Sequence, residues 1–130
     1  FGEYHYGDSF GYKVKAVPLL IGVNWLLLSF CALNLTEKIK TTVYGKAVIG
    51  AALLTGLDAL IEPLCGVYDF WHWETGSAPI RNYIVWFIFS FFLQLVGQSM
   101  HIERRHPLAG LIFALQVVFF TVLLVVHFFS

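Results

Sequence analysis

Charged side chains are scarce in this chain of 130 residues. Asp, Glu, Lys and Arg together make up 12% of the sequence, apolar residues make up 58%, and the formal net charge is zero. Soluble domains carry about 25% charged residues, so this composition excludes an ordinary soluble protein. The lack of a basic excess also removes the electrostatic basis for binding nucleic acid, and we predict no nucleic-acid partner.

Cysteine and metal-binding patterns are equally sparse. Cys31 and Cys65 lie near opposite ends of neighbouring apolar segments. Because a disulfide needs Cα atoms within about 7 Å, we predict two free, buried thiols. His101 and His106 are five residues apart with two arginines between them, which does not match an HExxH zinc motif. We therefore interpret residues 101–107 as a solvated loop and predict no metal site.

Long apolar runs are what the chain has in abundance. Four segments are each close to the ~20 residues that a helix needs to cross a bilayer. The sequence thus predicts an all-α, polytopic membrane helical bundle forming a single domain over residues 1–130. The chain starts at Phe1 rather than at a methionine, so we expect a fragment of a longer protein. The predicted membrane helices span residues 17–35, 44–64, 82–100 and 108–129.

Positive charge on the short loops predicts the topology. Loop 36–43 carries Lys38 and Lys40, and loop 101–107 carries Arg104 and Arg105. With four spans these loops share one side, and basic loops favour the cytoplasm. We expect both loops to be cytoplasmic, with the N-terminal segment, the second connection and the C-terminus on the outer side.

Two acids near the end of the second predicted span are the most informative feature. Asp58 and Glu62 are four residues apart, which places both side chains on one face of a helix. Ionisable groups inside a membrane are costly by several kcal/mol and usually have a function. Like charges at this spacing do not both ionise readily, so one acid is expected to keep its proton. The structural alternative is that these acids only hold helices together through hydrogen bonds.

Other polar residues follow the same pattern. Thr55 continues the stripe of the two acids along the second span, and buried amides in a membrane need partners. We therefore predict that this stripe faces a polar stripe of the third span around a small polar cavity. The third-span stripe consists of Asn82, Trp86, Ser90 and Gln94.

Two further helix faces have simpler interpretations. Ala52, Gly56 and Ala59 form a small-residue face on which another helix can pack closely. The segment 108–129 has almost no polar residue beyond Gln116. We predict that this last segment is scaffold that faces lipid.

The segment between the second and third spans is dense in aromatic residues. Trp71 and Trp73 are typical of the aromatic belt at a membrane surface. A belt does not explain the acids Asp69 and Glu74 that flank them. The alternative is a lid over the cavity, in which the indole rings stabilise a cation.

These residues also carry a family resemblance. Residues 1–7 (FGEYHYG), 18–25 (PLLIGVNW), 57–63 (LDALIEP), 69–73 (DFWHW) and 82–87 (NYIVWF) resemble the carotenoid biosynthesis membrane-protein family. Its members include bisanhydrobacterioruberin hydratase and γ-carotene 1′-hydratases. The resemblance covers residues 1 to about 92, and members are usually longer, with additional spans before this region. This implies an N-terminally incomplete chain.

The resemblance implies a hydro-lyase that adds water across the terminal carbon–carbon double bond of an acyclic carotenoid. Protonation of the alkene gives a tertiary cation, which water then captures, and no cofactor is needed. The implied partners are the acyclic carotenoid, water, membrane lipid and other carotenoid biosynthesis enzymes. The implied location is a prokaryotic cell membrane.

The residue roles follow from combining the resemblance with this chemistry. Asp58 or Glu62 is the expected proton donor, and Asp69 is the expected base or water-orienting group. The remaining candidate site residues are expected to position these groups, contact substrate or stabilise the cation. They are Asn24, Trp25, Trp71, Trp73, Asn82, Tyr83 and Trp86.

Two alternatives stay open at the level of sequence. An end-group cyclase shares the protonation step but lets an internal double bond capture the cation, which a dry pocket would favour. A non-enzymatic carrier or assembly subunit would use the intramembrane acids to relay protons or to join helices.

Overall fold

The computed structural model describes residues 3–100, 102 and 104–130. It is mostly helical, and four of its helices are long and apolar enough to cross a membrane. The predicted all-α membrane bundle is confirmed, and each helix ends within one turn of its predicted limits. The helices are α1 (Leu19–Glu37), α2 (Val43–Ile61) with a following 3-10 turn η1 (Glu62–Leu64), α3 (Ile80–Ser99) and α4 (Pro107–Phe129).

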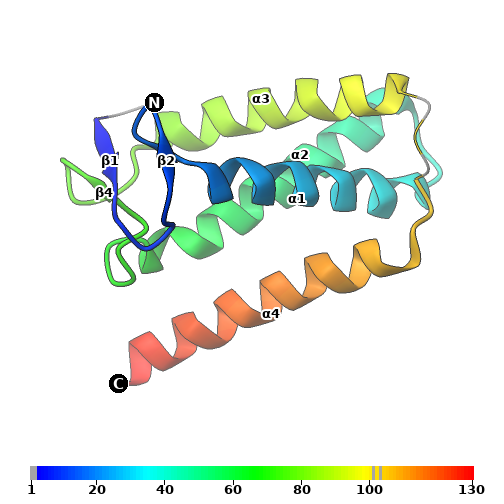
Figure 1. Ribbon diagram of the computed structural model, residues 1–130. Coiled ribbons are helices and arrows are strands. Elements are labelled where there is room, and N and C mark those ends of the chain that lie inside the picture. The colour runs from blue at the N-terminus through cyan, green and yellow to red at the C-terminus, as the bar shows by residue number, and fades with distance from the viewer. Residues whose placement is uncertain (1–2, 101, 103) are drawn as a thin grey trace.

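Two small two-stranded sheets, which the sequence did not predict, lie together at one end of the bundle (Figure 1). Strand β1 (Tyr4–Tyr6) pairs antiparallel with β4 (Trp71–Trp73), and β2 (Lys13–Val14) pairs with β3 (Val17–Pro18). Strands of two or three residues are too short to show an alternating pattern in the sequence. The pairing of β1 with β4 fastens the N-terminal segment over the connection between α2 and α3.

The register of β1 and β4 sorts their side chains onto two faces. Tyr4 lies opposite Trp73 and Tyr6 lies opposite Trp71. Because alternate residues of a strand share a face, these four aromatic rings lie on one face of the sheet. The ring centroids of Tyr4 and Trp73 are 5.0 Å apart. An aromatic surface thus covers the strand end of the bundle.

Helices α2 and α3 pack closely because small residues let them approach. A Cβ atom built on Gly50 of α2 would collide with the side chain of Gln94 on α3. Gln94, Ser90 and Asn82 are all buried on α3. Asp58 of α2 lines one small cavity with Asn82 and Trp86 of α3, and the facing of the two polar stripes along their whole length stays a prediction.

The small-residue face of α2 has a different environment. Ala52, Gly56 and Ala59 are exposed, and nothing in the described part of the chain lies within 4 Å of a Cβ built on Gly56. None of the described helices packs there. Cys31 and Cys65 are free and buried, as predicted.

The loops between α1 and α2 and between α3 and α4 lie at the end opposite the strands (Figure 1). Glu37 joins them, because its carboxylate lies 3.1 Å from Lys46 Nζ and 3.8 Å from Arg104 Nε. The basic loops therefore share one end, as the topology requires, and their cytoplasmic location stays a prediction. Of the predicted solvated loop 101–107, His101 and Glu103 lie outside the described residues.

Candidate functional site

Asp58 lies in the last turn of α2, and its side chain is directed into the bundle. The residue is 5% exposed. Its buried Oδ2 has no hydrogen-bond partner among the residues that the structure describes. An isolated carboxylate is very costly to bury, so this environment favours the uncharged acid that carries its proton.

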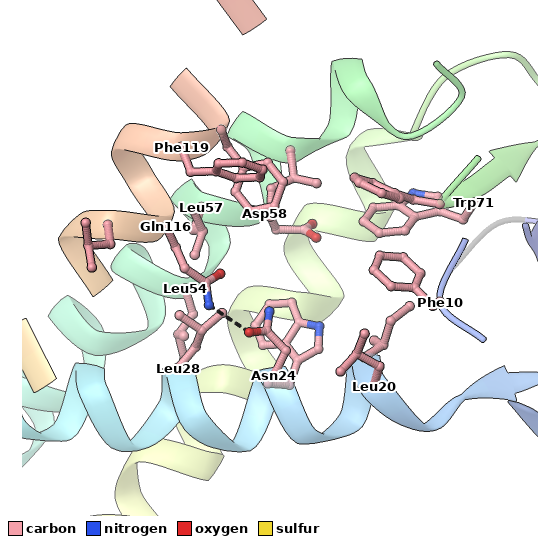
Figure 2. Close-up of a pocket in the computed structure, with 16 residues that line it drawn as sticks. Phe10, Leu20, Asn24, Leu28, Leu54, Leu57, Asp58, Trp71, Gln116 and Phe119 are labelled. Atoms are coloured by element: carbon pink, nitrogen blue, oxygen red, sulfur yellow. Dashed lines mark hydrogen bonds between the residues drawn. The ribbon is translucent and has the colours of Figure 1, made fainter. Parts of the chain in front are cut away.

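The carboxyl group of Asp58 points into a cavity of about 390 Å³ between α1, α2 and α4 (Figure 2). Most of the lining side chains are apolar. Leu20 of α1 and Leu115 and Phe119 of α4 line it and are each more than half exposed. The cavity therefore opens between α1 and α4 on a surface that faces lipid in a membrane. The apolar lining residues drawn in Figure 2 include Phe10, Leu20, Leu28, Leu54, Leu57 and Phe119.

An amide pair interrupts this apolar lining. Gln116 Nε2 of α4 donates a hydrogen bond to Asn24 Oδ1 of α1 at 2.7 Å, and both side chains line the cavity (Figure 2). The interpretation of 108–129 as scaffold facing lipid is therefore incomplete, since α4 also forms one wall of the cavity. A single amide inside a 23-residue apolar helix was the available signal, because buried amides in membranes seek partners.

Asp58 also lines a second, smaller cavity, which we call the chamber. It has a volume of about 30 Å³, and about 10–15 Å³ is enough for one water molecule. The chamber thus has room for roughly two water molecules. It lies beneath the aromatic face of β1 and β4, and its lining residues are Tyr4, Tyr6, Ile21, Trp25, Asp58, Trp71, Trp73, Asn82 and Trp86.

The chamber brings together residues of α1, α2, α3 and the two strands β1 and β4. Trp25 of α1 and Trp86 of α3 stack with centroids 4.6 Å apart and planes 3° apart. Asn82 in the first turn of α3 is 3% exposed. Trp25 and Trp71 line both the chamber and the large cavity. Asp58 is therefore the carboxyl group at the boundary between the two spaces.

Tyr6 is a chamber residue that sequence analysis did not single out as a site residue. Its hydroxyl lies 3.3 Å from that of Tyr4. Burial raises the pKa of Tyr6 well above its usual range, with a smaller contribution from the hydrogen bond with Tyr4. No sequence pattern identified Tyr6, because its position depends on a strand too short to show alternation.

Glu62 lies one turn further along the chain and has different surroundings. Its Oε2 accepts a hydrogen bond from Trp71 Nε1 at 3.3 Å, and its Oε1 accepts one from Trp73 Nε1. Glu62 lines a third cavity of about 470 Å³, together with Cys65 and Tyr83. The two neighbouring acids thus border different cavities, with the tryptophans of β4 between them.

Asp69 is not brought to the other two acids. Its Oδ1 lies 2.8 Å from His72 Nε2, and its Oδ2 accepts a hydrogen bond from the Asp8 N–H at 2.8 Å. The His72 hydrogen bond, followed by that from Asp8, holds the pKa of Asp69 below its usual range. Asp69 lines none of the three cavities described above. Its contacts attach the N-terminal segment to the aromatic turn, the segment that carries Trp71 and Trp73.

Comparison with known proteins agrees with this membrane architecture. No curated protein and no solved structure matches the chain significantly. A family model described as carotenoid biosynthesis protein matches residues 1–130. The match extends through α4, beyond the region of about 92 residues in which the resemblance was apparent. The chain therefore belongs to the carotenoid biosynthesis protein family.

Proposed function

We propose that this protein hydrates the terminal double bond of an acyclic carotenoid, with Asp58 as the acid catalyst. The observation that carries the proposal is the position of Asp58. Its carboxyl group borders both an apolar cavity of about 390 Å³ and a chamber of about 30 Å³. Hydration needs an apolar site for the alkene, a site for water, and an acid within reach of both.

The large cavity suits one end of a long polyene. Its volume lies within the ~300–1,000 Å³ that is common for small-molecule sites. The exposed side chains of Leu20, Leu115 and Phe119 mark an opening toward lipid, where such a substrate dissolves. Only an end group needs to enter between α1 and α4, while the rest of the polyene stays in the bilayer.

The proposed reaction balances without any other reactant. The Asp58 proton adds to the less substituted carbon of the terminal double bond, and the π electrons form the new C–H bond. The adjacent carbon becomes a tertiary cation. A water oxygen donates a lone pair to that carbon, and the resulting oxonium loses a proton to the Asp58 carboxylate. The products are a tertiary alcohol and the regenerated acid.

Aromatic side chains contribute to stabilising the cation. Trp25 and Trp71 line both spaces that Asp58 borders. A desolvated cation–π contact is worth about 2 kcal/mol. Enzymes lower barriers by about 8–23 kcal/mol, so the placement of the acid and of water must supply most of the effect.

Asp58 is the better candidate for the acid than Glu62. Both carboxylate oxygens of Glu62 already accept indole hydrogen bonds, and Glu62 does not line the large cavity. Glu62 is therefore proposed as a positioning residue that holds Trp71 and Trp73 over the chamber. Asp69 is proposed to act further out, by fastening β1 to β4.

The test is expression of the protein in a host that makes an acyclic carotenoid, followed by mass spectrometry of the pigments. Hydration adds the mass of one water molecule for each end that reacts. We expect this product with the wild type and not with Asp58→Asn. Failure of the wild type to add water in membranes where it is folded would contradict the proposal.

Cyclisation is the second candidate, and the apolar lining of the large cavity favours it. A cyclase would change the absorption spectrum of the pigment and leave its mass unchanged. The Asn24–Gln116 amide pair and the water-sized chamber favour hydration. An unaltered pigment would instead support a carrier or assembly role.

A further inference from the structure

We propose that Asn82 and Tyr6 hold the water molecule that attacks the carotenoid cation. This inference rests on the proposed hydration and assigns its second reactant to the chamber. It predicts that the two residues decide what happens to the cation after Asp58 has formed it.

Asn82 contributes an amide group to the wall of the chamber. The residue is 3% exposed. A buried amide in a membrane interior needs hydrogen-bond partners. Because Asn82 lines the chamber with Asp58, a water molecule there can both donate to its carbonyl oxygen and accept from its NH₂ group.

Tyr6 reaches the chamber from the opposite direction. It lies on β1, and its register opposite Trp71 places it on the aromatic face that covers the chamber. Its hydroxyl interacts with the Tyr4 hydroxyl at 3.3 Å. A hydroxyl group has one donor and two acceptor positions, so Tyr6 retains the capacity to hold water. The pairing of β1 with β4 thus brings the Tyr6 hydroxyl to the chamber, in addition to the polar groups that α2 and α3 supply.

The chemistry explains why water needs to be held. Once the proton of Asp58 has moved to the alkene, the cation can lose a proton from a neighbouring carbon or be captured by an internal double bond. Capture by water requires an oxygen lone pair close to the cationic carbon at that moment. A water molecule with its hydrogens directed to Asn82 and the new carboxylate of Asp58 presents such a lone pair.

The experiment measures the ratio of hydrated product to deuterium that enters the non-hydrated carotenoid. This ratio reports how much of the cation is captured by water. Membranes that contain the protein and lycopene, an acyclic carotene, are incubated in D₂O, and the pigments are analysed by mass spectrometry. Asn82→Leu fills the chamber and removes the amide. We expect hydrated product to fall on the order of 100-fold, which is typical for a misplaced reactant, while deuterium still enters the recovered non-hydrated carotenoid.

Tyr6→Phe provides a milder variant that keeps the ring and removes only the hydroxyl. We expect a shift in the same ratio by several-fold. Gln98→Leu is the matched control, because it replaces an amide at the far end of the same helix, where Gln98 contacts Arg104. Its ratio of hydration to deuterium entry should equal that of the wild type.

Two outcomes would overturn the inference. One is an unchanged ratio in both Asn82→Leu and Tyr6→Phe. The other is a parallel loss of hydration and deuterium entry in both variants, which would indicate a structural role. If the wild type itself neither hydrates lycopene nor introduces deuterium, the proposed function fails instead.

Discussion

Asp58 and Glu62 are one helical turn apart in sequence and lie in contrasting surroundings. Asp58 is almost fully buried and faces an apolar cavity, and its Oδ2 has no hydrogen-bond partner among the described residues. Glu62 is partly exposed and faces a separate cavity, and each of its carboxylate oxygens accepts a hydrogen bond from one indole. The identity and spacing of two acids therefore do not define their roles. The surroundings of each carboxyl group define its role.

The backbone alone does not explain this divergence. Helix α2 ends at Ile61, and Glu62 begins a 3-10 turn that contains Pro63. Glu62 nevertheless has helical backbone angles, and its N–H still bonds to the Asp58 carbonyl, so it continues the face of Asp58 one turn further on. Strand β4 then supplies the two indoles that bind its carboxylate.

The largest expected effect in this comparison is on activity at Asp58. Asp58→Asn keeps the shape of the side chain and removes the transferable proton. We expect hydration to fall at least ~100-fold, the lower range for loss of a general acid. The rate of hydrated carotenoid formation in isolated membranes measures it. Wild-type rates in this variant would exclude Asp58 as the acid.

A smaller loss is expected at Glu62. Glu62→Gln retains an oxygen that accepts one indole hydrogen bond and replaces the other oxygen with an amide. Because Glu62 positions Trp71 and Trp73 without touching the alkene, we expect roughly a tenfold loss, well short of the general-acid range. The same membrane assay applies. A loss as large as that of Asp58→Asn would show that the two acids act as one catalytic unit.

Stability should change in opposite directions at the two acids. Asp58→Leu replaces an unpartnered buried acid with an apolar group, so we expect a higher free energy of unfolding. Glu62→Leu leaves the indole N–H groups of Trp71 and Trp73 without an acceptor, with an expected loss of about 1–3 kcal/mol. Thermal unfolding in detergent, followed by tryptophan fluorescence, measures both. Destabilisation by Asp58→Leu would indicate a partner that holds the acid in place.

The smallest effect concerns the exposed acid Asp69. Because its pKa is lowered in the folded state by His72 and the Asp8 N–H, its stabilising contribution is present above the ordinary pKa of about 3.9. That contribution disappears as the pH falls through the lower folded pKa. We expect acid to loosen β1 from β4 in the wild type and to have less effect in Asp69→Asn.

Hydrogen exchange of the β1 and β4 amides between about pH 5 and pH 2 measures this loosening, with the pH dependence of intrinsic exchange removed. Glu74→Gln is the control, because Glu74 is exposed at the end of the same turn. An identical pH response in the wild type and in Asp69→Asn would remove Asp69 from the attachment of the N-terminal segment.

Much of this architecture was predictable because it depends on local sequence properties. Hydropathy over about 20 residues defines a membrane helix, and all four spans were found in this way. Helical periodicity placed Asp58 toward the stripe of Asn82, Ser90 and Gln94. The aromatic turn was also apparent as a possible cover, since its tryptophans and acids are adjacent in the chain.

The sequence alone thus determined that this protein is a four-helix membrane bundle with acids on its second span, because hydrophobic length and helical period are local. Only the tertiary structure decided which of the two acids has a carboxyl oxygen without a hydrogen-bond partner among the described residues. It also decided that Tyr6 lies opposite Trp71 and that Gln116 donates a hydrogen bond to Asn24. These contacts link residues 65 and 92 positions apart. They depend on how whole helices and strands pack, and no short window of sequence contains that information.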